Sequence, residues 1–293
     1  MATTTRPAWV LVPLALVVGG AATLLRARKA PISFDAVRAI PSGAAVVVTV
    51  DLSRLRGGPL AELVRSPRGD LGACGVDPLA RGTTLAVGMP GEGDEFGVAV
   101  AGPFDARELA ACASAAIQGR KGWPTTRREQ GFEVVADATA RGAGVVAVRD
   151  GGPLLFGGAA YVRRMIDAAT SPPAALDPRH AALRVEIDAA APVVGTLVRG
   201  EADEGLRGLA VSAAVGERVE VRAFARCDRD ETCAALGNLA KNAKDELGPL
   251  GRLTWLGAAL ARTSLDARGP TLRARVDLSV LEAREAAAAA LDR

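Results

Sequence analysis

Residues 46–55, VVVTVDLSRL, and residues 183–192, LRVEIDAAAP, open the two halves of the chain in the same way. Both segments contain β-branched residues and continue through an aspartate, so each predicts a strand that ends near Asp51 or Asp188. An aspartate at such a strand end is expected to cap the turn or helix that follows. The segments share a pattern rather than identities, which indicates an internal duplication of roughly 130 residues per half.

The order of elements behind these two strands supports the duplication. The first half predicts strands and helices at 44–52, 58–65 (helix), 83–89, 96–101, 105–117 (helix), 132–137, 145–150, 153–156 and 161–169 (helix). The second half predicts them at 182–188, 192–199 (helix), 208–215, 218–225, 228–247 (helix), 256–264, 271–278 and 280–291 (helix). Adjacent hairpins imply antiparallel sheets, and the helices between them imply an α+β fold with helices on one face.

A second stretch, AWVLVPLALVVGGAATLL from Ala8 to Leu25, contains no charged residue. Because a helix rises ~1.5 Å per residue, this run nearly matches the thickness of a bilayer core and predicts a transmembrane signal anchor. Trp9 and a basic cluster at the other end would contact the interface and acidic headgroups: Arg26, Arg28 and Lys29. A cleaved signal peptide and a buried core helix are the alternatives. The first cysteine is Cys74, which excludes a lipid-anchored amino terminus.

The anchor sets the predicted domain organisation. It comprises a short tail at 1–7, the transmembrane helix at 8–25, a juxtamembrane linker at 26–43, the first repeat at 44–169, a Pro-rich connector at 170–181 and the second repeat at 182–293.

The side of the membrane follows from two opposing signals. The basic residues after the anchor favour a cytoplasmic main domain. The four cysteines form two local pairs, Cys74 with Cys112 and Cys227 with Cys233, as expected of two disulfides in an exported domain. Four thiols allow three connectivities, and cysteine is also an ordinary small core residue. The prediction is a single-pass protein of the bacterial inner membrane whose main domain is periplasmic.

Charge excludes one class of partner. Of 36 Lys and Arg residues, four flank the anchor, which leaves 32 against 33 acids and a net charge of −1. The remainder shows no basic stripe along the sequence, and its aromatic residues are few. Nucleic-acid binding needs clustered positive charge, so we expect no nucleic-acid partner.

No motif assigns catalysis, a cofactor or a metal. Gly88–Gly93 is followed by a strand rather than a helix, so it predicts a hairpin turn and not a phosphate loop. The acidic residues of that turn lack the alternating spacing of calcium loops. His180, the single histidine, follows the Pro-rich break, where an exposed linker residue is expected. Asp105 and Asp228 are predicted to begin the two long helices, with Glu108 completing a capping box at the first.

The segment IPSGAAVVVTVDLSRL at 40–55, with the anchor before it, resembles uncharacterised bacterial envelope proteins built from repeated strand–hairpin–helix units. The resemblance implies no activity and no site residues. The expected function is a non-enzymatic binding or scaffold role in the cell envelope, with the lipid bilayer and another envelope protein as partners. Two alternatives are an envelope hydrolase that uses carboxylates such as Asp51 and Asp188, and a periplasmic carrier of an apolar ligand.

Overall fold

The computed structural model describes residues 36–56, 75–92, 95–139, 144–170, 183–188, 205–215, 218–251, 255–283 and 285. These residues fall into two compact units, a first unit within 36–170 and a second unit within 183–285. The predicted anchor at 8–25 and its interfacial residues Trp9, Arg26, Arg28 and Lys29 lie outside the described residues. Within the described ranges, no helix has the length and hydropathy that crossing a membrane requires.

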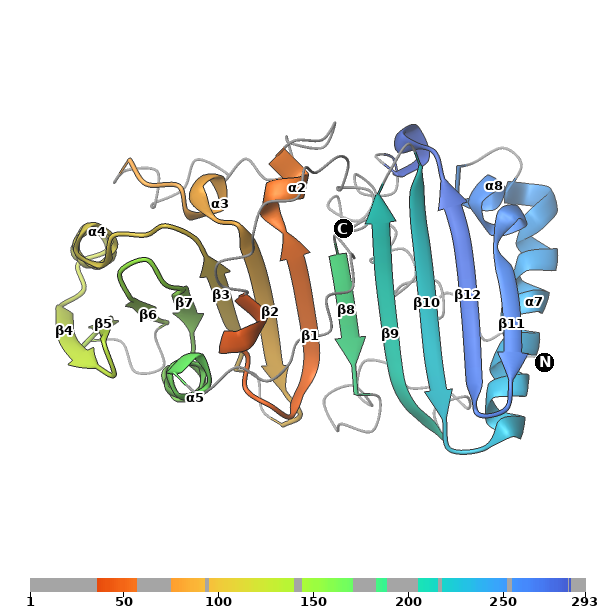
Figure 1. The fold of residues 1–293 in the computed structure, drawn as a ribbon, viewed down its shortest axis with the longest axis horizontal. Coiled ribbons are helices and arrows are strands. Elements are labelled where there is room, and N and C mark those ends of the chain that lie inside the picture. The colour runs from red at the N-terminus through yellow and green to blue at the C-terminus, as the bar shows by residue number, and fades with distance from the viewer. Residues whose placement is uncertain are drawn as a thin grey trace. The chain divides into compact units, whose positions relative to one another are not determined.

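The first unit is an antiparallel sheet with short helices (Figure 1). Its strands lie in the order β1-β2-β3-β7-β6-β5-β4. The strands are β1 (Ala44–Asp51), β2 (Thr84–Pro90), β3 (Gly97–Ala101), β4 (Pro124–Glu129), β5 (Phe132–Asp137), β6 (Val145–Val148) and β7 (Leu154–Gly157). The helices are η1 (Ala36–Ala39), α2 (Leu52–Arg56), α3 (Pro78–Arg81), α4 (Ala106–Gly119) and α5 (Ala159–Thr170).

Two glycines, Gly97 and Gly88, let α5 approach the sheet of the first unit closely. Gly97 of β3 lies opposite Gly157 of β7 in the register, and the Tyr161 ring and Met165 of α5 lie over Gly97. A Cβ at Gly97 would lie 2.7 Å from Cε1 of Tyr161, closer than carbon atoms can pack. Gly88 of β2 makes the same room beside the Tyr161 hydroxyl. The main core of the unit forms around this contact and includes Ala99, Phe132, Leu155 and Ile166.

Helix α4 covers the other face of the same strands. Phe132 and Val134 of β5 belong to the cluster that contains α5, whereas Val135, which points the opposite way, is equally buried. Helix α4 contacts β4, β5 and β6, and its buried Leu109 is not part of the α5 cluster. The two helices are seen end-on with the strands between them in Figure 1. The prediction of helices on a single face is therefore wrong for this unit, because its central strands are buried on both sides.

The second unit has the strand order β11-β12-β10-β9-β8. Its strands are β8 (Leu183–Ile187), β9 (Leu206–Val215), β10 (Val219–Cys227), β11 (Ser264–Arg268) and β12 (Thr271–Leu278), and its long helices are α7 (Asp230–Gly251) and α8 (Trp255–Arg262). All neighbouring pairs are antiparallel. Both helices contact β12, and α7 also contacts β10 and β11. Here the helices do lie on one side of the sheet (Figure 1).

Several segments differ from the prediction, and the short helices η1, α2 and α3 were not predicted. The segment 256–264, expected to be a strand, forms most of α8, and β11 occupies the residues expected to form the turn. The strand β4 was not predicted at all. The predicted helices at 58–65 and 192–199 lie outside the described residues, as does the Pro-rich connector with His180.

The Tyr161 hydroxyl provides a first test of the packing in the first unit. Tyr161 is buried, and its hydroxyl has no hydrogen-bond partner in the part of the chain that the structure describes. Burying a hydroxyl without a hydrogen-bond partner costs free energy, so Tyr161→Phe is expected to raise the free energy of unfolding by up to about 1 kcal/mol. Urea denaturation at pH 7 measures this change. A loss of stability in Tyr161→Phe would mean that the hydroxyl makes a stabilising contact.

The same side chain predicts an alkaline effect. Burial raises the pKa of Tyr161 above its ordinary value of 10.0, and nearby Arg164 lowers it by less. Because the folded state keeps the phenol neutral while the unfolded chain ionises it, stability is unaffected by this group below pH 10 and falls as the pH rises through the raised pKa. The Tyr161→Phe variant should lose less stability than the parent chain above pH 10.

Candidate functional site

The predicted capping residues are local structural features. Asp51 accepts a hydrogen bond from the Arg54 amide at 3.0 Å and pairs with the Arg54 guanidinium, so it caps α2. Asp105 accepts from the Glu108 amide at 2.9 Å and begins α4 as expected. Asp228 lies two residues before α7 and accepts from the Thr232 hydroxyl at 3.3 Å. Each of these three carboxylates therefore already accepts a hydrogen bond from a residue three or four positions further along the chain.

The glycine-rich segment after β2 joins two antiparallel strands, which confirms the predicted hairpin. Gly88 pairs with Gly97 across β2 and β3, and the next element that the structure describes after this turn is the strand β3. Of the acidic residues in the turn, Glu92 and Glu95 are described and Asp94 is not. No group of His, Cys, Asp and Glu that could hold a metal ion occurs among the described residues.

One of the two predicted disulfides is confirmed. Cys227, the last residue of β10, is bonded to Cys233 in the first turns of α7, and both are buried. Cys112 of α4 is also disulfide-bonded. Its predicted partner, Cys74, lies outside the described residues. The Cys227–Cys233 bond fixes the end of the central strand β10 to the helix behind it.

The surface with the most binding potential is the face of the second sheet that lies opposite α7 and α8. Along β10, Val219, Val221 and Ala225 are buried against the helices, and the intervening residues point away from them. The same alternation runs through the paired strands. The outward positions are Arg184 and Glu186 of β8; Gly208, Ala210, Ser212 and Ala214 of β9; Glu220, Arg222, Phe224 and Arg226 of β10; Thr271, Arg273, Arg275 and Asp277 of β12; and Ser264, Asp266 and Arg268 of β11. We call this surface the open face.

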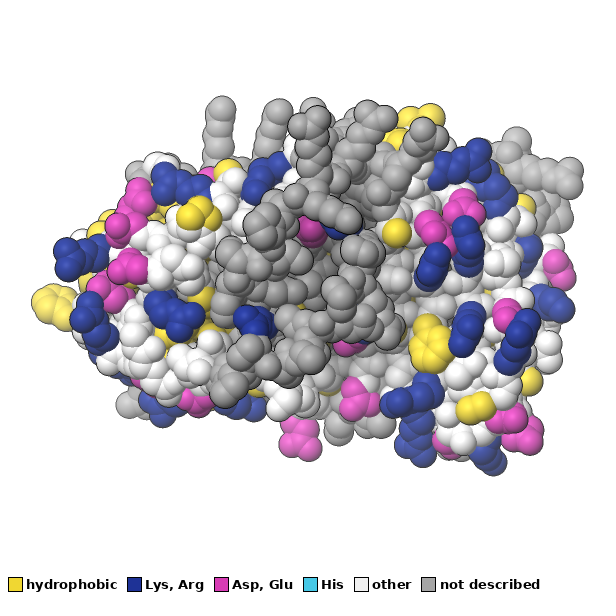
Figure 2. Space-filling view, in the orientation of Figure 1, with side chains coloured by type: hydrophobic (Ala, Val, Ile, Leu, Met, Phe, Trp, Pro, Cys, Tyr) yellow, Lys and Arg dark blue, Asp and Glu magenta, His cyan; other side chains and the backbone are white. Residues whose placement is uncertain are grey.

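Arginines surround a single aromatic side chain on the open face. In the register, Phe224 lies opposite Arg273 on one side and Ala210 on the other. The Arg273 guanidinium lies 6.0 Å from the centroid of the Phe224 ring, at the outer limit of a cation–π contact. Arg222 and Arg226 flank Phe224 on its own strand. Figure 2 shows this arrangement as dark blue side chains around yellow ones over the strands β10 and β12.

The carboxylates of the open face engage some of these arginines. Glu220 accepts a hydrogen bond from Arg222 at 2.7 Å and pairs with Arg275 at 2.8 Å. The hydrogen bond from Arg222, which outweighs burial, lowers the pKa of Glu220, and the charges of both arginines add to this. Asp266 pairs with Arg268 in the same way at 3.1 Å.

Arg226 and Arg273 differ from their neighbours. Within the described residues, neither forms an ion pair with a carboxylate, and both are exposed. A guanidinium stays protonated at any physiological pH and presents donors that match a carboxylate or phosphate. With Phe224 between them, these two residues offer charge and an apolar contact on one small area. Such a surface is suited to binding rather than to proton or group transfer.

Sequence reasoning did not find the open face. Its residues come from five strands and alternate with core residues, so the sequence shows no basic stripe. The register of β10 and β12 is what brings Arg222, Arg226, Arg273 and Arg275 together. Counting arginines at alternate positions of each predicted hairpin would have revealed part of the cluster.

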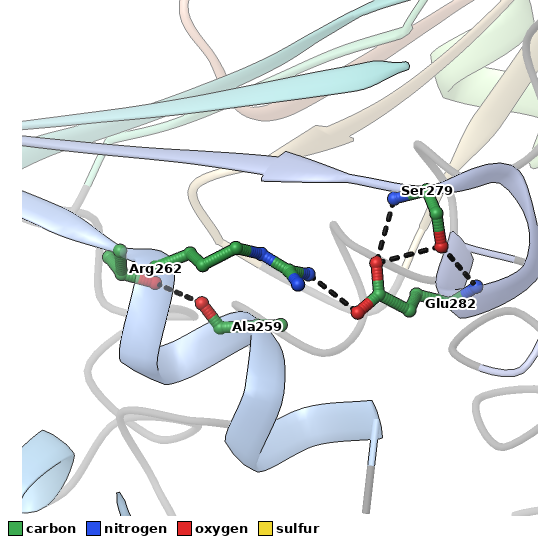
Figure 3. A network of polar contacts seen from close by, with 5 residues as sticks. Ala259, Arg262, Ser279 and Glu282 are labelled. Atoms are coloured by element: carbon green, nitrogen blue, oxygen red, sulfur yellow. Dashed lines mark hydrogen bonds and ion pairs between the residues drawn. The ribbon is translucent and has the colours of Figure 1, made fainter. Parts of the chain in front are cut away.

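A network at the end of β12 holds the next helical turn in place (Figure 3). The Ser279 amide and hydroxyl donate to Glu282 at 2.7 and 2.8 Å, and the Glu282 amide donates to the Ser279 hydroxyl at 3.3 Å, which is a capping box. Arg262, the last residue of α8, donates to Glu282 at 2.5 Å. The network ties α8 to the turn that follows β12.

This network predicts an acid-sensitive contribution to stability. Burial opposes ionisation of Glu282, but the hydrogen bonds from Arg262 and Ser279 outweigh it and lower its pKa below 4.5. The contribution is therefore present above pH 4.5 and is lost as the pH falls through the lowered pKa. Glu282→Gln, which keeps the cap but removes the charge, is expected to cost under about 1 kcal/mol at pH 7, because Arg262 is partly exposed. The difference between the denaturation midpoints of the parent chain and Glu282→Gln should be smaller at pH 3 than at pH 7. An equal difference at both pH values would contradict the assignment.

Comparison with known proteins gives a fold likeness only. No family model matches the chain, and no curated protein matches it. Solved structures of the protein TP0453 in its crystal forms III, I and IV are similar to it, with TM-scores of 0.56, 0.51 and 0.55. Each is 12% identical and covers 88% of this chain, and the aligned regions cover 99%, 98% and 97% of the TP0453 chains. At this identity the likeness concerns the arrangement of strands and helices.

Proposed function

We propose that this chain is a membrane-anchored, non-enzymatic binding protein of the cell envelope, and that the open face is its binding surface. The observation that carries the proposal is the set of Arg226, Arg273 and Phe224 on a sheet face that no helix of the described residues covers. Arginine and aromatic residues are enriched where protein interfaces concentrate their binding energy. The rest of the open face is charged or small, as a polar rim would be.

The proposed location rests on two features. The uncharged run at Ala8–Leu25 has the length and flanks of a single-pass anchor, with Trp9, Arg26, Arg28 and Lys29 at its ends. The Cys227–Cys233 disulfide supports an oxidising compartment, because disulfides persist outside the cytoplasm and are rare within it. We therefore place both units in the periplasm, tethered to the inner membrane.

The proposed origin is an internal duplication. In the first unit β1 pairs with β2 of the hairpin β2–β3, and β3 pairs with β7 of the hairpin β6–β7. In the second unit β8 pairs with β9 of the hairpin β9–β10, and β10 pairs with β12 of the hairpin β11–β12. Under this correspondence the hairpin β4–β5, which contacts α4, has no counterpart in the second unit and is an addition to the first. In the first unit α4 and α5 cover opposite faces of the sheet, whereas α7 and α8 both lie on one face of the second sheet.

A pair of fusions tests the location. Alkaline phosphatase fused after Arg293 should be active in intact bacteria, because the enzyme needs an oxidising compartment to fold. A fluorescent protein fused at the same site should stay dark if it is exported through the general secretion route. The matched control lacks residues 1–30 and should reverse both results. Fluorescence without phosphatase activity in the full chain would place the units in the cytoplasm and overturn the proposed location.

A further inference from the structure

We infer that the partner of the open face is an acidic protein surface, whose carboxylates pair with Arg226 and Arg273 and whose apolar side chain packs on Phe224. This inference rests on the proposed binding role and adds the chemistry of the partner. It concerns the second unit alone, and every residue in it belongs to strands β8, β9, β10, β11 or β12.

The charge argument begins with the two guanidinium groups that pair with no carboxylate of the described residues, those of Arg226 and Arg273. Glu220 and Asp277 lie beside Arg222 and Arg275 at one end of the open face, where they neutralise positive charge. Arg226 and Arg273 lie toward the other end and are diagonal neighbours across β10 and β12. Diagonal neighbours lie about 7–8 Å apart, with their Cβ atoms somewhat closer, which is within reach of two carboxylates on one face of a strand or helix. Two charge-assisted pairs at this spacing would fix the register of a partner.

The apolar part of the argument is Phe224. Its side chain is 37% exposed, although aromatic residues are commonly buried. On its β9 side it lies beside small residues, Gly208, Ala210 and Ser212, which do not rise above the sheet. A partner side chain can therefore reach the ring edge. Covering the ring removes apolar surface from water and excludes water from the neighbouring ion pairs, which strengthens them.

The acidic residues of the open face favour a protein over a uniform polyanion. Glu186 and Asp266 lie on the strands at either side of the cluster, so a nucleic acid or an anionic membrane would meet repulsion there. A protein surface of mixed charge can place its own lysines or arginines against these two carboxylates. A single aromatic residue also provides few stacking positions for the bases of a nucleic acid.

The binding experiment uses the full chain in non-ionic detergent micelles. The probe is a fluorescently labelled random copolymer of glutamate and tyrosine at a ratio of about 4:1, and poly-glutamate is the comparison that lacks an apolar group. Fluorescence anisotropy should show that the copolymer binds more tightly than poly-glutamate. The charge reversal Arg226→Glu/Arg273→Glu is expected to weaken both by about 10-fold or more, since each exposed pair contributes up to about 1 kcal/mol and the reversal adds repulsion. Phe224→Ser should remove the advantage of the copolymer and leave poly-glutamate binding within about twofold.

The matched control reverses two exposed arginines of the first unit, Arg107→Glu/Arg128→Glu, which changes the net charge equally. It should leave the affinities for the copolymer and for poly-glutamate within about twofold. These arginines are not part of the open face, and salt screens the interaction between distant charges. Far-UV circular dichroism verifies that each variant is folded.

Three results would overturn the inference. The first is equal weakening by the two charge reversals, which would mean that net charge alone drives binding. The second is an unchanged affinity in Arg226→Glu/Arg273→Glu. The third is tighter binding of oligothymidine, or of micelles that contain phosphatidylglycerol, than of the copolymer. None of these results changes the outcome of the fusions, so failure of the partner assignment is distinguishable from failure of the proposed location.

Discussion

The variant Gly157→Ala is expected to lower the free energy of unfolding by about 3 kcal/mol or more, because overpacking and an unfavourable backbone conformation act together. Gly157 has φ of +155°, a conformation that residues with a Cβ rarely adopt. A Cβ there would overlap the carbonyl oxygen of Phe96 and lie 2.9 Å from Cα of Gly97. Both are backbone atoms of the neighbouring strand, so no side-chain rotation relieves the contact.

The loss of unfolding free energy should exceed that of an ordinary strand substitution because β7 is paired with a strand on each side. Gly157 pairs with Gly97 in β3 and with Val145 in β6, so moving its backbone disturbs two ladders. Gly97 in turn supports the Tyr161 ring. A shift of β7 therefore also disturbs the packing of α5 on the main core of the first unit.

Gly119→Ala is the matched control in the same unit. Gly119 is the last residue of α4, and a Cβ at this position meets no atom of the described residues within 4 Å. Alanine has the higher helix propensity and restricts the unfolded chain, so this variant should gain about 0.5 kcal/mol. Urea denaturation of both variants, followed by far-UV circular dichroism, should show shifts of opposite sign. A Gly157→Ala chain that unfolds at the parent midpoint would show that the strands can move apart without loss.

How far the sequence predicts this fold depends on whether an element has a buried face. Strands β1, β2, β3, β5, β9, β10 and β12 are close to their predicted bounds, because each contains β-branched or apolar residues that pack on one side. Strand β4 has the sequence PTTRRE and four exposed residues in a row, so it has no apolar alternation to detect. The turn after it contains a glycine, Gly131, which is the one sequence feature that indicates a hairpin here. Gln130 and Gly131 have φ of 48° and 83°, the backbone of a tight hairpin turn.

The error at α8 has a different cause. The segment LGAALARTS at 256–264 is apolar enough to suggest a strand after a long helix. Its burial instead follows a helical period, because Ala259, Leu260 and Thr263 are buried whereas Ala261 and Arg262 are exposed. The alanine content favours a helix as well. The open face shows a further limit of sequence reasoning, since no single segment contains it and only strand register assembles it.

The second large effect is expected from removing the Cys227–Cys233 disulfide. The double variant Cys227→Ala/Cys233→Ala should lose roughly 2 kcal/mol of unfolding free energy, because closing even a short loop restricts the unfolded chain. Both sulfur atoms are buried, so the loss of packing adds to this value. Ala234→Ser, an exposed change one residue from Cys233, is the control and should alter stability by less than about 0.5 kcal/mol.

This disulfide also bears on the open face. Cys227 directly follows Arg226 and ends the strand that carries Phe224, and the bond holds that strand end to the first turns of α7. Cys227 also donates its amide to the carbonyl of Pro270, which precedes β12. Without the bond, we expect the end of β10 to open locally, so that Arg226 and Arg273 no longer keep one spacing. Amide hydrogen exchange should show faster exchange at residues 224–227 in the double variant than in Ala234→Ser. Equal exchange, together with an unchanged denaturation midpoint, would show that the sheet alone fixes the strand.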